Sequence, residues 1–592
     1  DALPIYHYIL ECTKSNIEQA QNRFFVQGDP QAILVAELAD HDEESLAKKA
    51  NELCRAYQDE GMGYHFPIVT GPNIQKVWKL RKAGLGLLSN IPGDAKPAPV
   101  IEDTAVAVED LPAYIRDFNE ILDKHKLFCV HYAHAGSGEL HLRPMLNLKT
   151  EEGNRLFRII AEEIAALVKK YRGSLSGEHG DGRLRGEFIP FMIGKENYEL
   201  IKQIKELFDP QHIFNPNKIV DTPSMNTSLR YQPGQETPEF DTVLSFEENK
   251  GILRSAELCN GSGDCRKSHL SGGTMCPSYM ATKQEKDTTR ARANILREFL
   301  TQSDKANRFD HEEIKEVMDL CLSCKACKSE CPSNVDMAKL KAEFQYQYYK
   351  ANGIPLRTNL IAHFNYNMGL AAIAPKIHNF LFSNPLTGQM LKGFMGVARK
   401  RSMPLLHKQT LRSWWKKHQP KKGAPKGKVY LFADEFTNFH DTEIGIKAVE
   451  LLEGLGYEVA IPPHVESGRT FLSKGLLEEA REVAIKNVDS LKGLISEETP
   501  LVGIEPSAIL GFRDEYPSLV YDTQKKEAKA LGENALLFDE FIAREIDKGN
   551  ITSEQFSQEE KLIKLHGHCH QKAVASLVPT KRMLSLPSNY KV

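Results

Sequence analysis

The sequence has no long apolar run, no excess of one charge and few cysteines for its length. No apolar stretch approaches the roughly 18 to 20 residues of a membrane span, and no signal peptide opens the chain. A formal net charge of -3 over 592 residues gives no global reason to expect nucleic acid or an acidic partner. Eleven cysteines are too few for a disulfide scaffold. We therefore expect a globular protein without a membrane span.

A dinucleotide-binding fingerprint and a flavin-domain motif are also missing. The length suggests three or four domains, and 41% hydrophobic residues are enough for ordinary cores. The first residue is Asp1 rather than Met, so the chain is expected to be a fragment.

The cysteines are unevenly spread. Seven of them crowd between Cys259 and Cys331, which favours metal clusters in a reducing compartment and hence a cytoplasmic location. Cys12, Cys54 and Cys129 stand alone and are expected to be buried or inert.

Two histidines, His134 and His141, stand seven residues apart, and a later glycine-rich turn contains Glu178 and His179. Two neutral imidazoles and a carboxylate suit an open site for a divalent metal, and His179 is free to move a proton. Glycines between the first two histidines disfavour a helix, so a strand end and its turn are expected to present them. The alternative is that these are structural histidines.

Residues 1 to about 225 are predicted to be mixed α/β, with strands separated by helices as in a split βαβ sheet. The predicted strands are 32–38 and 128–133. A helical stretch is predicted from the end of the first strand to Tyr57, and further helices are predicted over 77–83 and 156–171.

The strongest pattern is Cys321-x-x-Cys324-x-x-Cys327-x-x-x-Cys331-Pro332, which we call the second run. Its spacing is typical of bacterial ferredoxins, in which thiolates surround a cubane cluster. Four cysteines at this spacing favour iron–sulfur over zinc, the alternative.

The first run is Cys259, Cys265 and Cys276, with Ser262 at the middle cysteine position of two-cluster ferredoxins. In two-cluster ferredoxins the last cysteine of each run binds the cluster of the other run, and this pattern would form two cluster sites here. The four-cysteine cluster would use Cys276, Cys321, Cys324 and Cys327, and the three-cysteine cluster would use Cys259, Cys265 and Cys331. The latter is expected to be a three-iron form, or to take Ser262, water or another group as its fourth ligand.

The segment from Tyr348 to Lys428 is partly helical and basic near its end. Docking on a membrane surface or on an acidic redox partner would suit its cations and aromatics. The alternative is a solvated linker packed on its neighbours. No binding motif for nucleic acid accompanies the charge. The last stretch is predicted to be α/β, with strands 428–434, 457–461 and 501–507 and a helix over 443–455.

The first 220 residues or so resemble the carboxyl-terminal substrate domain of flavin-linked D-2-hydroxyacid dehydrogenases. The matching stretches are His134-x-Gly136-x-Gly138-x-x-His141, Gly173-Ser-Leu-Ser-Gly-Glu-His-Gly180 and Phe208-Asp-Pro-Gln-His-Ile-Phe-Asn-Pro216. The resemblance implies a ferredoxin-like α+β fold, a metal such as Zn or Mn on His134, His141 and Glu178, and His179 as the base.

The same resemblance assigns substrate contacts. It implies that Arg81 binds the carboxylate at the reacting carbon and that Lys96 binds a distal one. Leu85 stands where D-2-hydroxyglutarate enzymes carry threonine, and Arg143 where they carry asparagine. Arg143 could add a contact with a substrate carboxylate, so the identity of the substrate acid is not decided. The alternative for Arg81 and Lys96 is solvated surface cations.

The last stretch resembles the cysteine-rich domain of glycolate oxidase and heterodisulfide reductase iron–sulfur subunits. Glu466-Ser-Gly-Arg469 replaces one Cys-Cys-Gly run, and Ala508 replaces a cysteine after Pro-Ser. His566-Gly-His-Cys-His-Gln571 keeps the second signature, so Cys569 is a candidate further cluster ligand.

This order resembles the fused flavin/iron–sulfur D-2-hydroxyacid dehydrogenases and implies a multidomain α+β and α/β protein. The expected divisions are a substrate and metal domain (1–225), a linker (226–250), a helical ferredoxin-type 4Fe-4S domain (251–347), a helical basic linker (348–427), and a partly degenerate, truncated α/β cysteine-rich domain (428–592).

The resemblance implies oxidation of a D-2-hydroxyacid, with D-2-hydroxyglutarate or D-lactate leading and glycolate third. FAD is expected mainly on a domain upstream of this chain or on a partner, and electrons would pass through 4Fe-4S clusters to a quinone or another carrier. A peripheral contact with the inner face of the membrane is left open. The alternative is a non-catalytic electron-transfer subunit that serves a separate flavoprotein.

Overall fold

The structure is a computed structural model that describes residues 2–15, 17–88, 90–420, 426–557 and 559–592. The side chain of Leu85 and the basic residues 421–425 lie outside this description. The chain divides into two compact units: residues 1–238 with 332–334, and residues 239–331 with 335–592. The boundary at Pro238 falls inside the expected linker, while the finer division into five segments stays a prediction.

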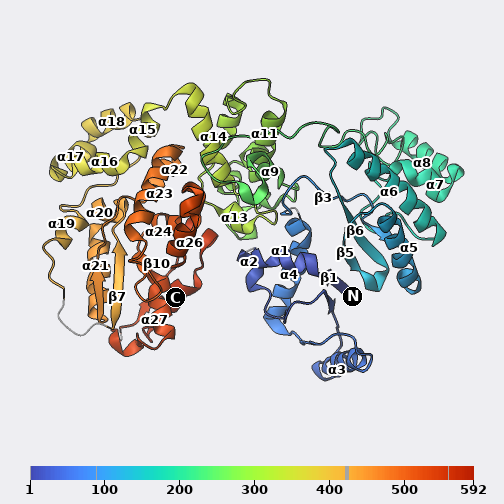
Figure 1. Cartoon of the computed structure of the whole chain (residues 1–592), viewed down its shortest axis with the longest axis horizontal. Coiled ribbons are helices and arrows are strands. Elements are labelled where there is room, and N and C mark those ends of the chain that lie inside the picture. The colour runs from blue at the N-terminus through green and yellow to red at the C-terminus, as the bar shows by residue number, and fades with distance from the viewer. Residues whose placement is uncertain (1, 16, 89, 421–425, 558) are drawn as a thin grey trace. The chain divides into compact units, whose positions relative to one another are not determined.

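The first unit alternates strands with helices (Figure 1). Its strands are β1 (Ala2–Tyr6), β2 (Ala32–Ala36), β3 (Lys96–Pro97), β4 (Thr104–Ala105), β5 (Cys129–His134) and β6 (Glu139–Leu146). Its helices are α1 (His7–Ser15), α2 (Ile17–Gln21), α3 (Glu43–Asp59), α4 (Ile74–Leu88), α5 (Leu111–Lys124), α6 (Glu151–Lys170), α7 (Ile189–Ile193) and α8 (Lys195–Phe208).

The strands form one sheet in the order β2-β1-β5-β6-β3, and β4 pairs with β6. The recorded pairings are antiparallel. Helices α5 and α6 cover one face of β5 and β6, with Leu140 and Leu142 packed beneath them. Helices α1 and α4 cover the other face, where Val130 and Tyr132 lie. The β5–β6 part of the sheet is therefore covered on both sides, which fixes which side chains of these strands share a face.

The helix α6 illustrates how local sequence sets this frame. The Thr150 side chain caps its first turn by accepting a hydrogen bond from the backbone N–H of Gly153. Phe157, Ile160 and Ile164 are buried at helical spacing and face the sheet.

The second unit begins with helices connected by loops that carry most of the cysteines of the two runs, and it continues into a helical segment (Figure 1). The helices of the cysteine region are α9 (Ile252–Glu257), α10 (Pro277–Thr282), α11 (Thr289–Gln302), α12 (Glu312–Asp319), α13 (Ala326–Glu330) and α14 (Met337–Asn352). Those of the helical segment are α15 (Leu356–Ala362), α16 (Phe364–Ala371), α17 (Pro375–Ser383), α18 (Pro385–Phe394) and α19 (Leu411–Trp415).

The unit ends in a parallel sheet of order β10-β9-β7-β8. The strands are β7 (Gly427–Phe432), β8 (Tyr457–Ala460), β9 (Leu501–Gly503) and β10 (Ala535–Leu537), with a separate pair β11 (Lys561–Leu562) and β12 (Tyr590–Lys591). The helices are α20 (Glu435–Phe439), α21 (Thr442–Gly454), α22 (Arg469–Ser473), α23 (Leu477–Leu491), α24 (Pro506–Asp514), α25 (Tyr516–Leu519), α26 (Lys525–Glu533), α27 (Phe538–Asp547), α28 (Cys569–Val574) and α29 (Val578–Leu584).

Helices α21 and α27 pack on one face of this sheet, and α23, α24 and α26 pack on the other. The unit β7–α21–β8 is the βαβ unit predicted from the sequence. The multidomain α+β and α/β fold class is thus confirmed. Within the described ranges, no helix is both long enough and apolar enough to cross a bilayer.

Candidate functional site

The β5–β6 hairpin brings His134 and His141 together. Tyr132 faces His141 across the hairpin, and His134 faces Glu139 two residues before His141. His134 and His141 therefore lie on one face of the sheet, because directly paired residues and residues two apart point the same way. Their rings are 5.3 Å apart between centroids. A strand end and its turn present both histidines, as the intervening glycines indicate.

Glu178 reaches this face from the loop after α6. His134, His141 and Glu178 each offer a ligand atom within 4.8 Å of the others' ligand atoms, and Glu178 Oε1 lies 3.6 Å from His141 Nε2. His141 is buried, and its Nδ1 has no hydrogen-bond partner in the described part of the chain. Two imidazoles and a carboxylate at these distances fit the donor set of a divalent metal.

Burial lowers the pKa of His141 to about 4, with further lowering from His134 and His179. The His141 imidazole is therefore neutral near pH 7, which is the form that binds metals. The opposite shift occurs at buried Glu139. Burial, a hydrogen bond to Asp103 and the nearby Glu178 raise its pKa to about 8.

His179 stacks on His141 with centroids 5.4 Å apart and an angle of 8° between the ring planes. Its Nε2 is 3.2 Å from Glu178 Oε1. Its Nδ1 is 3.8 Å from carboxylate oxygens of both Glu102 and Asp103. The His179 ring therefore lies between the carboxylates of Glu102, Asp103 and Glu178.

Asp103, which the sequence alone did not indicate, holds the Glu178–His179 loop. It is fully buried and adopts a positive φ of 89°. Its carboxylate accepts hydrogen bonds from the backbone N–H groups of Glu178 (2.9 Å) and His179 (3.0 Å). It also accepts one from the Ser176 hydroxyl (2.5 Å) and one from Arg185 (3.3 Å). Asp103 lies more than 70 residues before these partners, and no spacing in the sequence marks the contact.

Among the predicted substrate residues, Arg81 contacts β5, the strand that ends in His134. It donates a hydrogen bond to the Ala133 carbonyl (3.2 Å) and lies 5.3 Å from the centroid of the Tyr132 ring. Burial lowers its pKa, while Tyr132 and Glu178 oppose that shift. Arg81 therefore lies within electrostatic range of Glu178, one of the metal-ligand candidates.

The other two predicted substrate residues have different surroundings. Arg143 is buried and forms an ion pair with Glu102, so its charge is already compensated. Lys96 pairs with Leu146 in β3–β6, five residues along β6 from His141, and donates a hydrogen bond to the Ile91 carbonyl. Their contacts with a substrate stay predictions.

In the second unit, a small cavity is lined by the four cysteines expected to share one cluster. They are Cys276, Cys321, Cys324 and Cys327. Arg292, which is fully buried, donates a hydrogen bond to Cys276 Sγ (3.5 Å), and Lys341 donates one to the Cys321 carbonyl (2.7 Å). Cations beside the thiols suit a cluster held by thiolates.

The cysteines expected to form the other cluster also have neighbouring thiols. Burial raises the pKa of Cys265, and Cys259 and Cys276 raise it further. Ser262, at the missing cysteine position, is exposed, and its backbone N–H donates to the Asn260 side chain. The ligand sets of both clusters stay proposals.

Cys569 lies near the second run. Burial raises the pKa of Cys324 to about 11, and Cys321, Cys276 and Cys569 add to the shift. The neighbouring His570 ring Nε2 is 3.0 Å from the Ser323 carbonyl. Cys569 therefore lies near Cys324 of the four-cysteine cavity, while its role as a further cluster ligand stays a prediction.

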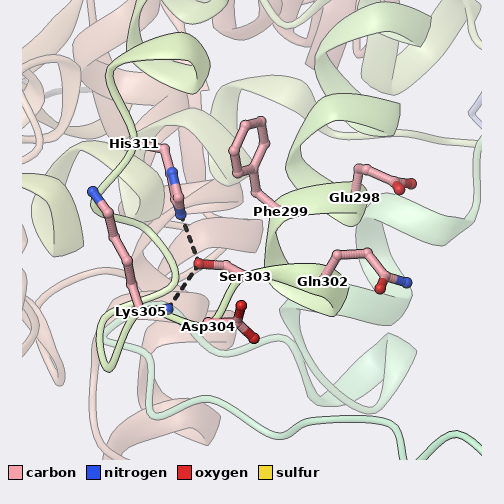
Figure 2. A pocket seen from close by; sticks show the side chains of 7 residues that line it. All are labelled: Glu298, Phe299, Gln302, Ser303, Asp304, Lys305 and His311. Carbon is pink, nitrogen blue, oxygen red and sulfur yellow. Dashed lines mark hydrogen bonds between the residues drawn. The ribbon is translucent and has the colours of Figure 1, made fainter.

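Another pocket lies where α11 ends (Figure 2). There Ser303 Oγ lies 2.7 Å from His311 Nε2 and accepts a hydrogen bond from the Lys305 backbone N–H. Ser303 also ends α11 as its C-cap. These bonds close the loop between α11 and α12, and the pocket shares no lining residue with the cysteine cavity.

Two protein families match the chain. The description "FAD linked oxidases, C-terminal domain" matches residues 10–219, and "4Fe-4S dicluster domain" matches residues 258–336. The second match contains both cysteine runs. The chain therefore contains one region similar to the C-terminal domains of FAD-linked oxidases and one similar to 4Fe-4S dicluster domains. These two matches support FAD and iron–sulfur clusters as cofactors.

Curated relatives extend the similarity beyond these matches. The chain is 29% identical over 565 residues to D-2-hydroxyglutarate dehydrogenase of Escherichia coli K12, covering 87% of this chain and 54% of the relative. The enzyme of the same name from Pseudomonas putida KT2440 is 29% identical over 75% of this chain and 48% of its own length. A mitochondrial D-lactate dehydrogenase [cytochrome] of Arabidopsis thaliana is 27% identical over 30% of this chain and 31% of its own length. The chain spans about half the length of its first two relatives.

Proposed function

We propose that this chain is the substrate-binding and iron–sulfur part of an FAD-dependent D-2-hydroxyacid dehydrogenase. D-2-hydroxyglutarate is the leading substrate, followed by D-lactate and glycolate. The observation that carries the proposal is the convergence of His134, His141 and Glu178 with His179 stacked beside them. The names of the relatives support the order of substrates.

In this proposal the protein orients the acid and moves one proton. Arg81 binds the carboxylate next to the reacting carbon, because a guanidinium can donate two parallel hydrogen bonds to a carboxylate. His179 takes the hydroxyl proton on Nε2, the nitrogen on the side of Glu178. The carboxylates of Glu102 and Asp103 face Nδ1 and stabilise the resulting imidazolium.

The expected cofactors supply the remaining chemistry. A divalent ion held by His134, His141 and Glu178 would polarise the hydroxyl, and a bound flavin would accept the hydride. The acid loses one proton and one hydride and becomes the 2-oxoacid. The two electrons would then leave singly through the clusters to a quinone or another carrier.

The decisive experiment is anaerobic dye reduction by the complete gene product, with flavin, iron and divalent metal counted in the same sample. D-2-hydroxyglutarate, D-lactate, glycolate and the L-isomers are offered in turn. Turnover with one D-acid is expected, and His179→Ala should lower it by about two to four orders of magnitude while metal content is kept. His65→Ala, an exposed histidine, is the matched control.

Absence of turnover with every acid, with iron present and flavin absent, would contradict the dehydrogenase proposal. That result would favour an electron-transfer subunit that serves a separate flavoprotein. Equal turnover by His179→Ala and the unaltered enzyme would exclude His179 as the base.

A further inference from the structure

Helices α16 to α18 expose apolar side chains along stripes of helical spacing. The exposed apolar residues are Tyr366 and Leu370 on α16, Ile373 in the turn after it, and Ile377 and Phe380 on α17, and they are 52% to 81% exposed. On α18 they are Leu386, Met390 and Phe394, which are 73% to 78% exposed. Residues three or four apart in one helix share a face, so the apolar residues within α16, within α17 and within α18 each form a stripe along their own helix. Contiguous exposed apolar surface marks an interaction site, whereas scattered apolar residues do not.

Hydrogen bonds on the opposite faces of α17 and α18 fix the orientation of these helices, so their apolar faces stay exposed. On α17, Asn379 exchanges two hydrogen bonds of 2.8 Å with the backbone of Leu406. On α18, buried Lys392 donates hydrogen bonds to the carbonyls of Arg399 (2.7 Å) and Arg401 (3.0 Å). The helices α17 and α18 also pack against each other.

The segment that contains α16 to α18 carries charged side chains of positive sign only. No aspartate or glutamate occurs between Glu343 and Asp434, while lysine and arginine recur throughout. Lys376 lies exposed on α17 beside the apolar stripe. Arg399, Lys400 and Arg401 are exposed in the turn that Lys392 holds against α18.

We propose that the face formed by the stripes of α16–α18, with the flanking Lys376 and 399–401 turn, docks on a lipid bilayer that contains acidic headgroups. Apolar side chains at the acyl boundary with cations beside them are the pattern of helices that lie in the membrane interface. The absence of acidic residues removes the repulsion that an anionic surface would otherwise meet. An acidic protein would match the cations but not the apolar stripes. This proposal does not depend on the dehydrogenase activity.

The test uses the complete protein and vesicles of phosphatidylcholine, with and without an added third of phosphatidylglycerol, in a flotation assay. Binding is expected to the acidic vesicles, at least tenfold weaker without phosphatidylglycerol, and weaker as salt rises. The triple variant Leu386→Ser, Met390→Ser, Phe394→Ser should lose binding at least tenfold, because its apolar stripe no longer enters the interface. The variant Arg399→Gln, Lys400→Gln, Arg401→Gln should lose between tenfold and a hundredfold on acidic vesicles only.

Two controls separate docking from damage. Leu562→Ser with Val578→Ser replaces apolar residues of similar exposure elsewhere in the second unit and should bind as the unaltered protein does. Iron content and far-ultraviolet circular dichroism should be unchanged in every variant, since all replaced side chains point outward. Phe394→Trp should shift its fluorescence emission to the blue when acidic vesicles are added.

Three results would overturn the proposal. They are failure of the unaltered protein to float with acidic vesicles, equal flotation by the unaltered protein and both triple variants, and self-association that the apolar triple variant abolishes while flotation persists. The last result would assign the face to a second copy of the chain.

Discussion

The ammonium of Lys325 and the carboxylate of Asp514 form a buried ion pair that joins the second cysteine run to helix α24. The two side chains are 3% and 8% exposed. Asp514 also pairs with Lys328, and Glu515 pairs with Lys325. Burial opposes ionisation of Asp514, yet Lys325 and Lys328 hold its pKa well below the usual value.

We therefore expect Asp514→Asn to destabilise the second unit by about 2 to 4 kcal/mol, because it removes the buried carboxylate that both ammonium groups share. Lys325 then keeps only Glu515 as a partner, and Lys328 keeps only the more distant Asp336. Urea unfolding of the complete protein, followed through iron–sulfur absorbance and circular dichroism, measures the loss. Glu482→Gln breaks the exposed pair with Lys486 and should change stability by no more than about 0.5 kcal/mol. Similar losses in both variants would contradict a structural role for the buried pair.

A second prediction concerns Asp103. Asp103→Asn removes a carboxylate that accepts backbone hydrogen bonds from Glu178 and His179. Metal affinity and turnover should each fall by about tenfold to a hundredfold, the usual cost of losing a group that orients metal ligands. The control is Asp117→Asn, which changes a surface ion pair between Asp117 on α5 and Lys170 on α6. Lowered stability with unchanged metal affinity and turnover would show that Asp103 only holds the fold.

A third prediction separates the two kinds of cysteine around the four-cysteine cavity. Cys324→Ala should lower the iron content by about four atoms per chain, because a cubane cluster needs its thiolates. Cys569→Ala should keep the iron content, since the crossed pattern already provides four ligands. Iron and labile sulfide are counted in each variant and compared with the unaltered protein. Equal iron loss in both variants would make Cys569 a cluster ligand.

A fourth prediction concerns pH. Asp434 is fully buried, and burial together with Glu435 raises its pKa to about 8. Between about pH 4 and pH 8 the folded protein keeps a proton that the unfolded chain releases, so this group lowers stability as pH rises through that window. Asp434→Asn should remove that slope and stabilise the unit by about 1 to 3 kcal/mol near pH 8, with little gain near pH 4.

Asparagine caps helices as well as aspartate does, so the Asp434 cap of α20 is kept in this variant. The control is Asp441→Asn, at the start of α21 in the same sheet domain. Urea unfolding at several pH values measures the slope. An unchanged slope in Asp434→Asn would show that other groups set the pH dependence.

Much of the fold and part of the site could be predicted because their signals are local. The predicted strand 457–461 is β8, and the predicted helix 443–455 is α21, shifted by one residue. The glycines between His134 and His141 indicated a turn, and the short spacings from Cys321 to Cys327 brought those thiols to one cavity. In each case, neighbours in the chain are neighbours in space.

The rest depends on contacts between distant parts of the chain. Asp103 meets Glu178 across 75 residues, and Lys325 meets Asp514 across 189. The compensation of Arg143 by Glu102 is of the same kind. Such pairs are set by how the sheets and helices pack, and residue type at either position does not identify the partner.

The β5–β6 register restricts which changes of sequence the hairpin tolerates. Seven is an odd number, so along one straight strand His134 and His141 would point to opposite faces. The turn between them reverses the chain and restores a common face. Deleting a single turn residue would therefore force a choice between keeping Leu140 and Leu142 under the helices and keeping the two imidazoles together. A change in the length of this turn would therefore require compensating changes in the hydrophobic core around Leu140 and Leu142.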